Sequence, residues 1–357
     1  MNFVALFMSV FAVIGAFDRI LGNRFGLGEK FEKGFMLLGT MALSMIGMIV
    51  ISPLIATSLK PFFDIVESTF GVDPSVIPAI LFANDMGGAP LSVEVASNTE
   101  IGLFNALVVS SMMGATFSFT LPYAMSAVSK ERHKYVFFGF LCGIVTIPIG
   151  CIVSGFILKI PAFLLLINTL PIILVSLIIV IGLVYIPDIC VKVFSFFGTF
   201  IKIVITIGLT LGIIKFLTGI ELVKGLEELS VGADVCVNAS VVMSGAFTFI
   251  EIMSRILSGA FKKLGNKLGI NEVSALGFMS TLATNATTFE MMNSMDQKGI
   301  VMNSAFAVSA AFTFAGHLAF TMAFNADYIF PVIIAKIISG ATALVIADLF
   351  YKKVFNK

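Results

Sequence analysis

The sequence predicts an all-α polytopic membrane protein. Of its 357 residues 58% are hydrophobic and only 12% are charged, and the mean hydropathy is +1.06. A water-soluble fold cannot bury that much apolar surface, whereas a membrane helix needs about 20 successive apolar residues. Such stretches recur along the whole chain, and two of them are interrupted by polar residues, glycine and proline.

Composition also excludes several classes of function. The formal net charge of +1 gives no support to nucleic-acid binding. The four cysteines are scattered without metal-ligand or disulfide-framework spacing, so neither a metal nor another cofactor is expected. The two histidines stand far apart and no nucleophile motif occurs, so the chain is not expected to be an enzyme. The lipid bilayer is the expected surrounding.

Hydropathy divides the chain into about nine full spans and two broken segments. A span at 3–17 is followed by an amphipathic interfacial segment at 26–34, a span at 35–59 and a second amphipathic segment at 60–70. The remaining full spans are expected at 101–128, 135–158, 161–186, 192–217, 235–257, 300–324 and 328–350. The basic stretch 259–269 is expected to be a linker.

The two broken segments, 74–98 and 271–296, interrupt apolar runs with polar residues. The first contains Asn84-Asp85-Met86-Gly87-Gly88-Ala89-Pro90, and the second contains Ala283-Thr284-Asn285-Ala286-Thr287-Thr288-Phe289-Glu290. The glycines and proline of the first motif prevent a regular helix from continuing. Irregular backbone at membrane depth is tolerated only where protein buries it or where it lines a wet cavity. We therefore interpret the two segments as halves of one solute site.

The distribution of lysine and arginine sets the expected orientation. Most of these residues lie in the stretches 19–33, 130–134, 255–267 and 352–357, and cytoplasmic links are enriched in basic residues. All of these stretches fall on one side of a membrane only if each broken segment returns to the side from which it entered. We therefore expect nine full spans, two re-entrant segments, an N-terminus outside and a C-terminus in the cytoplasm.

The two halves of the chain resemble each other at a nearly constant offset. Asn105, for example, recurs as Asn303 beside the second broken segment. We expect a first inverted repeat at 1–158, a connecting transmembrane helix at 161–186 and a second inverted repeat at 192–351. Inverted repeats with interrupted helices are typical of secondary transporters, which hold the solute near the midplane where the breaks meet.

Two motifs, 17–28 (FDRILGNRFGLG) and 84–90 (NDMGGAP), resemble the ethanolamine-utilisation permease family (EutH). The likeness extends over the whole chain in length and span pattern. The resemblance implies a bacterial inner-membrane transporter or facilitator of ethanolamine. Its neighbours would be enzymes that break ethanolamine down inside a protein-shelled microcompartment.

We accordingly expect import of ethanolamine by alternating access, with an elevator-like movement by analogy with other re-entrant folds. The alternative is a proton- or Na⁺-coupled secondary transporter of another small amine or amino acid. A homodimer is left open.

Ethanolamine at neutral pH is a small cation with one hydroxyl, so its site needs oxygen acceptors, and an aromatic face is an optional addition. Asp85 is the expected ammonium partner, because an ionised group at membrane depth costs about 2.5–3.5 kcal/mol and normally has a partner or a function. Glu290 fits either the site or the cytoplasmic surface. The other candidate substrate-binding residues are Asn84, Gly87, Gly88, Asn105, Asn285, Thr287, Thr288, Phe289 and Asn303.

Each candidate also has a purely structural interpretation. Asp85 and the amides and hydroxyls at the breaks are also suited to cap half-helices. The glycines make the turn, and the phenylalanine fits ordinary packing. Asn105 and Asn303 suit hydrogen bonds between helices. Elsewhere, His317 fits packing better than a proton relay, and Glu251 is expected to pair with Arg255 on its own helix.

Overall fold

The computed structural model describes residues 3–355, and those residues are folded as helices joined by short connections. Within this range seven segments are long and apolar enough to cross a membrane: Gly28–Phe70, Thr99–Ala127, Lys130–Ile157, Ala162–Tyr185, Pro187–Thr218, Leu229–Leu268 and Ala326–Phe355. The all-α membrane class is confirmed, with seven such segments where nine full spans were expected. The last residues of the basic stretch 352–357 lie outside the described range.

The first half of the chain contains α1 (Phe3–Ile20), α2 (Gly28–Met36), α3 (Leu38–Phe70), α4 (Val76–Leu81), η1 (Asn84–Met86), α5 (Gly88–Val95), α6 (Thr99–Phe104), the π-helical η2 (Asn105–Gly114) and η3 (Thr116–Thr120), α7 (Leu121–Ala127), η4 (Lys130–Arg132), α8 (His133–Ile144) and α9 (Ile147–Ile157). Helix α10 (Ala162–Tyr185) then connects this half to the rest.

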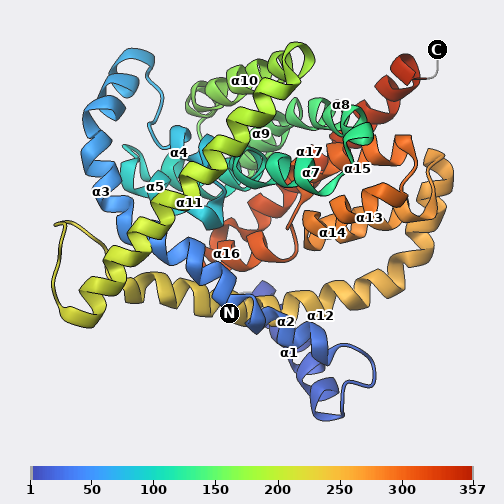
Figure 1. Ribbon diagram of the computed structural model, residues 1–357, viewed down its shortest axis with the longest axis horizontal. Coiled ribbons are helices and arrows are strands. Elements are labelled where there is room, and N and C mark those ends of the chain that lie inside the picture. Colours follow the sequence, from blue (N-terminus) through green and yellow to red (C-terminus); the bar gives the residue numbers. More distant parts are fainter. Residues whose placement is uncertain (1–2, 356–357) are drawn as a thin grey trace.

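The second half contains α11 (Pro187–Thr218), α12 (Leu229–Leu268), α13 (Glu272–Ala283), α14 (Asn285–Met291), η5 (Met292–Ser294), α15 (Gln297–Ala310), α16 (Gly316–Phe324), η6 (Ala326–Tyr328) and α17 (Ile329–Phe355). Figure 1 shows α12 running along one side of the molecule and α11 crossing over the others.

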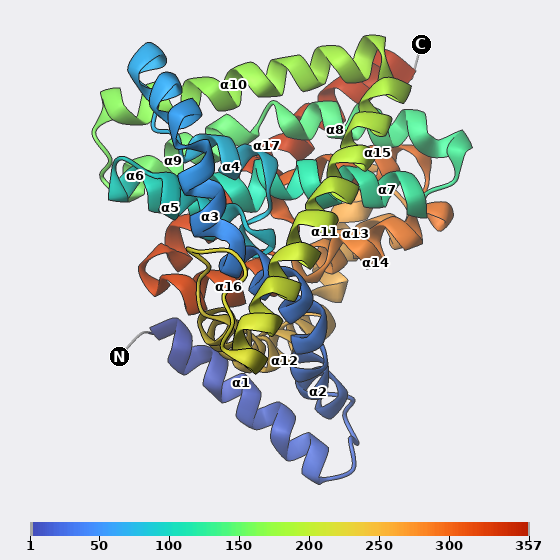
Figure 2. The same cartoon turned by 60° about the vertical axis from the view of Figure 1, so that its left-hand side comes forward.

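Helices α1 and α2 form an antiparallel pair that projects from the body of the protein (Figures 1 and 2). Asp18 holds their connection together, because its carboxylate accepts backbone N–H bonds from Phe25 (2.9 Å), Leu27 (2.7 Å) and Gly28 (3.0 Å). The chain turns there through a left-handed conformation at Gly26, with φ of 69°. The motif 17–28 therefore shapes a loop.

Glycines let the central helices approach closely. A methyl group on Gly139 of α8 would lie 2.4 Å from the carbonyl oxygen of Val301 in α15, and one on Gly208 of α11 would lie 2.1 Å from that of Gly47 in α3. These distances leave no room for a side chain, so the backbones pack directly against each other. The helices α15 and η2 are buried almost completely at the centre.

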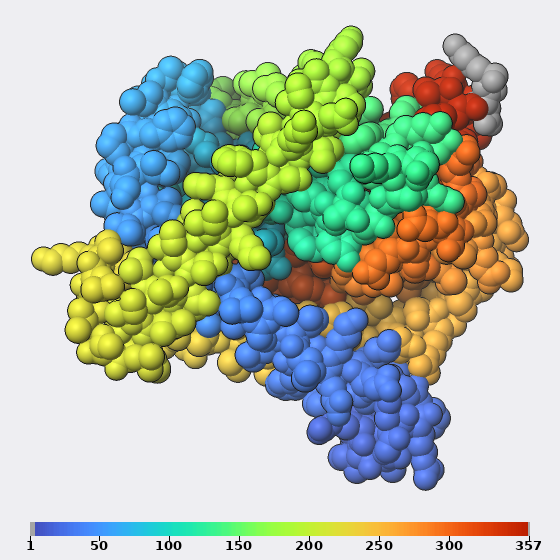
Figure 3. Space-filling model, viewed as in Figure 1, coloured from blue at the N-terminus to red at the C-terminus, as the bar shows by residue number. Residues whose placement is uncertain are grey.

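Helices α10 and α11 lie at the periphery. Figure 3 shows α11 on the surface along most of its length. Both helices expose large apolar side chains, among them Leu174, Ile178, Phe196 and Ile203. Such a surface is unfavourable in water and suits contact with lipid.

Several basic stretches meet at the same end of the helices. Arg132 donates hydrogen bonds to the backbone carbonyls of Met292 (2.9 Å) and Met295 (2.8 Å). Lys298 pairs with Asp348 (2.5 Å) near the end of α17 and also donates to the last carbonyl of α12. The stretch 130–134 thus lies beside the second broken segment and the carboxyl ends of α12 and α17.

The carboxyl half of α12 also contacts the α1–α2 pair. Glu251 pairs with Arg255 (2.8 Å), as expected, and with Lys30 (3.1 Å) of α2. The prediction of a linker at 259–269 is wrong, because α12 continues as one helix to Leu268. Its sequence keeps a helical pattern after the apolar part ends, and hydropathy alone reports only the loss of apolar residues.

The close packing of Gly208 gives a stability prediction. Gly208→Ala should destabilise the protein by about 1–3 kcal/mol, because its methyl group overlaps the backbone of Gly47. Gly259→Ala is the matched control, since nothing lies within 4 Å of a methyl group at that helical position. Thermal unfolding in detergent should show a lower midpoint for Gly208→Ala only, and equal midpoints would contradict the observed helix contact.

Candidate functional site

The first broken segment forms a hairpin, here defined as residues 73–98. The backbone N–H of Asn98 donates to the Asp73 carboxylate (2.8 Å), and the Ser92 hydroxyl donates to the Ser75 carbonyl (3.0 Å). The other carboxylate oxygen of Asp73 accepts the backbone N–H of Ser75 (3.0 Å). The two ends of this first hairpin therefore lie together, with α4 and α5 as its arms.

The second broken segment, residues 271–296, closes in a related way. The Asp296 carboxylate accepts the backbone N–H of Asn271 (2.9 Å) and the hydroxyl of Ser274 (2.7 Å). The Asn271 side chain also donates to the carbonyl of Ser294 (3.0 Å). This second hairpin has α13 and α14 as its arms.

The matching asparagines bond to the bases of the two hairpins. The Asn105 side-chain nitrogen donates to the hydroxyl of Ser75 (2.9 Å). The Asn303 side-chain nitrogen donates to the carbonyl of Ser274 (2.8 Å). Both asparagines are fully buried, and both hold the base of a hairpin rather than its tip.

The tip of the first hairpin depends on two glycines. Gly87 has a φ of 105°, and a methyl group there would lie 2.0 Å from the side chain of Met48 in α3. A methyl group on Gly88 would lie 2.3 Å from the carbonyl oxygen of Phe82. The glycines thus allow the chain to turn tightly between Phe82 and α5, and η1 presents Asp85 at this turn.

The tip of the second hairpin is an extended residue, Thr284, with φ −158° and ψ 132°. The next helix of this half is also broken, at 311–315 between α15 and α16. There the backbone N–H of Phe312 donates to the Thr281 carbonyl (3.1 Å), and that of Phe314 donates to the Leu282 carbonyl (3.0 Å). The two irregular stretches therefore satisfy each other's polar backbone groups.

One cavity joins the two tips. Its volume is about 430 Å³, and its wall includes Asp85, Met86, Phe119, Thr284, Phe312 and His317. Helices α3 and α12 complete the wall. The cavity is thus lined by residues far apart in the sequence, which come from both hairpins and from α3 and α12. This volume suits a small organic solute with some water.

The charged wall of the cavity continues into the protein as a row of three ionisable side chains. Asp85 is 29% exposed, and its Oδ1 lies 4.0 Å from Nε2 of His317. The other ring nitrogen, Nδ1, lies 3.1 Å from Nζ of Lys336, which also donates to the carbonyl of Ser111 (2.7 Å). Lys336 is fully buried. The sequence marks Lys336 only as a lysine within an apolar span, without identifying its partners.

Aromatic rings form another part of the wall. The ring centroids of Phe119 and Phe312 lie 5.8 Å apart, and Phe312 lies 5.0 Å from the ring of His317. A cation in the cavity would meet ring faces as well as the Asp85 carboxylate, which is the chemistry of an ammonium site.

Asn84 and Asn285 are fully buried beside the breaks. Within residues 3–355, neither polar atom of the Asn84 side chain has a hydrogen-bond partner. Asn285 donates to the hydroxyl of Thr120 (2.9 Å), while its side-chain oxygen is unpaired in the same range. Thr288 bonds to the carbonyl of Gly277 (3.1 Å) and so ties the arms of the second hairpin together.

The last three candidates lie farther along α14. Thr287 and Glu290 are exposed, and Glu290 accepts a hydrogen bond from the hydroxyl of Tyr123 (2.8 Å). Phe289 is fully buried, with ring contacts to Tyr123 and Phe140. Of the eleven predicted residues, Asp85 is the one that lines the cavity.

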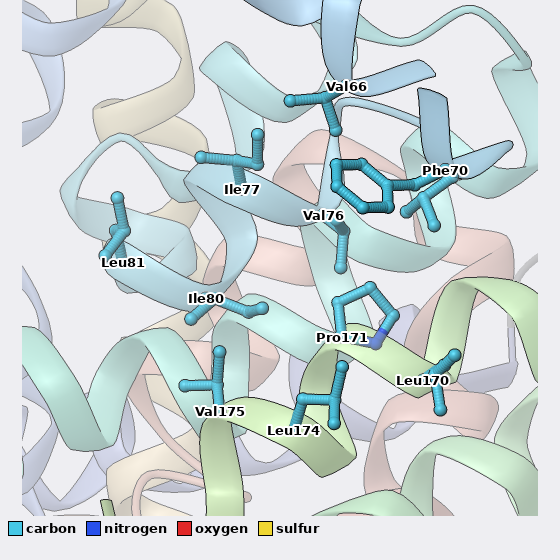
Figure 4. Close-up of a pocket in the computed structure, with 11 residues that line it drawn as sticks. Val66, Phe70, Val76, Ile77, Ile80, Leu81, Leu170, Pro171, Leu174 and Val175 are labelled. Atoms are coloured by element: carbon cyan, nitrogen blue, oxygen red, sulfur yellow. The ribbon is translucent and has the colours of Figure 1, made fainter. Parts of the chain in front are cut away.

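A second cavity is unsuited to a charged solute. Figure 4 shows this groove of about 410 Å³, lined by α3, α4 and α10 through side chains such as Val76, Ile80, Pro171 and Leu174. Every lining side chain is hydrocarbon, so the groove offers a cation no charged or hydrogen-bonding side chain. Within the described chain, no group of three or more His, Cys, Asp or Glu side chains is arranged to hold a metal ion.

Comparison with known proteins identifies relatives over nearly the full length. The family model described as "Ethanolamine utilisation protein, EutH" matches residues 1–350. The "Probable ethanolamine permease EutH" of Listeria monocytogenes is 39% identical over 350 residues, covering 98% of this chain and 94% of that protein. The protein of the same name from Salmonella typhimurium is 35% identical over 384 residues, covering 97% and 94%.

A further relative, the "Uncharacterized protein YxeR" of Bacillus subtilis, is 34% identical over 340 residues, covering 95% of this chain and 92% of that protein. No solved structure matches the chain.

The shared cavity gives an accessibility prediction. In a background lacking the four native cysteines, Met86→Cys and Thr284→Cys should both react with a small hydrophilic thiol reagent, because both positions line the same cavity. Thr288→Cys should stay unreactive, since that side chain is fully buried between the hairpin arms. Mass spectrometry of the labelled protein measures the difference. Equal reaction at all three positions would contradict a cavity that is lined by Met86 and Thr284 but not by Thr288.

Proposed function

Because the chain belongs to the EutH family of ethanolamine utilisation proteins, we propose that it is a membrane permease for ethanolamine, bound as the protonated amine between the two hairpin tips. The curated relatives carry the name of a permease, which agrees with the expectation that the chain is not an enzyme. The seven long apolar segments suit a multi-pass membrane protein.

The observation that carries the proposal is the position of Asp85. Among the described residues that line the cavity, Asp85 is the carboxylate, and it lies at the tip of the first hairpin, in the same cavity wall as Thr284 at the tip of the second. A carboxylate, a hydroxyl and the ring faces of Phe119 and Phe312 together match a small ammonium ion with one hydroxyl group. Asp85 binds the ammonium group in this proposal.

The unpaired amides support the same assignment. A buried amide without a partner costs about 1–3 kcal/mol, so such groups call for a ligand or water. Asn84 adjoins Asp85, and Asn285 adjoins Thr284, and both have unpaired side-chain atoms within the described residues. A modest movement of either tip would offer these amides to the hydroxyl of ethanolamine.

Transport proceeds by alternating access in this proposal, with an elevator-like movement. Helices α1, α2, α3, α11 and α12 pack largely against one another, and α8, α9, α15 and α17 form a second group. The hairpin tips meet α3 and α12 at the cavity, so the site lies between the two groups. Sliding one group past the other would carry Asp85 from one side of the membrane to the other.

Two inverted repeats, 1–158 and 192–351, joined by 161–186, account for this arrangement. The base of the first hairpin bonds to Asn168 near the start of α10, through the backbone N–H of Asp73 (2.9 Å). The base of the second hairpin instead contacts Arg132. The proposed hairpins enter from opposite faces of the membrane.

The positive-inside rule assigns the faces. The end that holds Arg132, Lys298 and the carboxyl end of α12 is rich in basic residues and is assigned to the cytoplasm. The proposed location is the inner membrane of a bacterium, with the N-terminus outside and the C-terminus inside.

A coupled carrier of another small amine or of an amino acid is the second candidate. The observation that favours coupling is the buried His317–Lys336 pair behind the cavity. Uptake into proteoliposomes after addition of a protonophore, or after removal of Na⁺, separates coupled from purely facilitated transport.

Removing the charge of Asp85 should weaken binding. Asp85→Asn should lower the affinity for ethanolamine by about tenfold to a hundredfold, because a hydrogen bond to a charged group is worth about 1.5–3 kcal/mol. Binding by the purified protein and uptake of radiolabelled ethanolamine into liposomes measure the effect. Glu94→Gln, which changes an exposed carboxylate of the same hairpin, is the control and should bind normally. Unchanged uptake by Asp85→Asn would remove Asp85 from the site.

The orientation of the protein in the membrane can be tested separately. Single cysteines at residues 130–134, in the same cysteine-free background, should be protected from an impermeant thiol reagent in intact cells and react after the membrane is opened. Labelling in intact cells would place this stretch outside, and the re-entrant arrangement of the first hairpin would then be wrong.

A further inference from the structure

Lys336 is a cation buried in the centre of the protein. Its side chain is fully buried, and the partners of its Nζ are the carbonyl oxygen of Ser111 and Nδ1 of His317. The carboxylate that balances this charge is Asp85, on the other side of the imidazole ring. An ammonium group that is not neutralised would be expensive in such surroundings.

The bond to Lys336 determines which nitrogen of His317 holds the proton. A charged lysine is only a donor, so Nδ1 of His317 must accept and Nε2 must carry the hydrogen. The Nε2–H then faces Asp85, at 4.0 Å from Oδ1. This is the arrangement suited to an empty site, in which the lysine charge and the carboxylate charge compensate each other.

An ammonium ion bound to Asp85 changes this balance. With Lys336 still charged, the buried centre would carry two cations and one carboxylate, and the Nε2–H of His317 would point at the donor groups of the solute. If Lys336 is neutral instead, its lone pair can accept from Nδ1–H, and Nε2 becomes an acceptor that faces the cavity. The second state has one cation, one carboxylate and matched hydrogen bonds.

We propose that Lys336 is a tethered substitute for the substrate, and that ethanolamine and one proton bind to the Asp85–His317–Lys336 row in exchange for each other. When the ammonium ion binds to Asp85, Lys336 transfers a proton from Nζ to Nδ1 of His317, and His317 releases the proton of Nε2 to water in the cavity. One cation enters and one proton leaves, so both the loaded and the empty centre are neutral. The protein is then an electroneutral amine–proton exchanger.

Among residues 3–355, no further charged side chain lines the cavity beside this row. Of the described residues, the ionisable side chains at the cavity wall are Asp85 and His317. Lys33 of α2 lies outside the wall, with its Nζ 5.1 Å from the ring centroid of Phe247, and Tyr123 bonds to the exposed Glu290. Neither of these contacts reaches His317 or Lys336, so the exchange is a property of the buried row.

This inference rests on the proposed function, and calorimetry on the purified full-length protein tests it. Titrating ethanolamine in buffers of different ionisation enthalpy counts the protons released, and we expect about one per ethanolamine bound. The affinity should rise by up to about tenfold per pH unit between about pH 6 and pH 8.

Lys336→Met should bind ethanolamine at least as tightly as the unchanged protein, without releasing a proton and without dependence on pH. Misfolding would weaken binding, so a misfolded variant cannot imitate this result. Lys336→Arg keeps a permanent cation and should bind about tenfold to a hundredfold more weakly, as expected for unrelieved repulsion across one ring. Lys202→Met, which removes an exposed lysine of α11, is the matched control and should release the proton as before.

Binding of ethanolamine without proton release, or weakened binding by Lys336→Met in a protein that still unfolds at the normal temperature, would overturn the exchange and leave the permease function intact. Absence of any ethanolamine binding or uptake by the unchanged protein would instead overturn the proposed function, and the exchange with it.

Discussion

One constraint governs the centre of this structure: polar backbone groups that neither water nor a regular helix can hydrogen-bond must find other partners, because leaving them unpaired is costly. Four stretches of irregular backbone meet near the centre, and each is stabilised by a neighbour. The backbone N–H of Ala83 donates to the hydroxyl of Ser118 (3.1 Å) in the π-helical η3, and a methyl group on Gly114 would lie 1.9 Å from the carbonyl oxygen of Phe82. The π-helical form of η2 and η3 thus accompanies the first hairpin, as the break at 311–315 accompanies the second.

The all-α membrane class and the positions of the two broken segments could be predicted from the sequence, because both depend on residue type and spacing along the chain. The break at 311–315 could not. Its residues, Ala-Phe-Thr-Phe-Ala, include neither glycine nor proline, and Phe312 has a left-handed φ of 61°. Tertiary hydrogen bonds to the second hairpin impose this conformation, which local sequence does not record.

The candidate site, too, could be predicted from the sequence only in part. Composition at the breaks directs attention to Asp85, which lines the cavity, but it does not indicate which neighbouring side chains face the cavity and which hold the hairpins. Asn105 and Asn303 match in sequence because they make related bonds at the hairpin bases. Lys336 is distant in sequence from both breaks, and only the packing of α17 against η2 and α16 brings it to His317. A search for charged residues inside expected spans would have singled it out, without naming its partners.

The proposed orientation of the hairpins and the proposed role of Lys336 address two requirements of the same transport cycle. In the proposed arrangement, hairpins that enter from opposite faces would let one cavity open to either side, and they would place Asp85, the proposed ligand of the solute, at membrane depth. A lone carboxylate would be stable there only while the solute is bound, so an empty carrier would be held back by the cost of moving a net charge through an apolar medium. A cation fixed to the protein removes that cost, provided that it loses its charge when the solute binds. His317 lies between Asp85 and Lys336 and has one nitrogen toward each. Transfer of a proton from Lys336 through the imidazole ring requires this geometry.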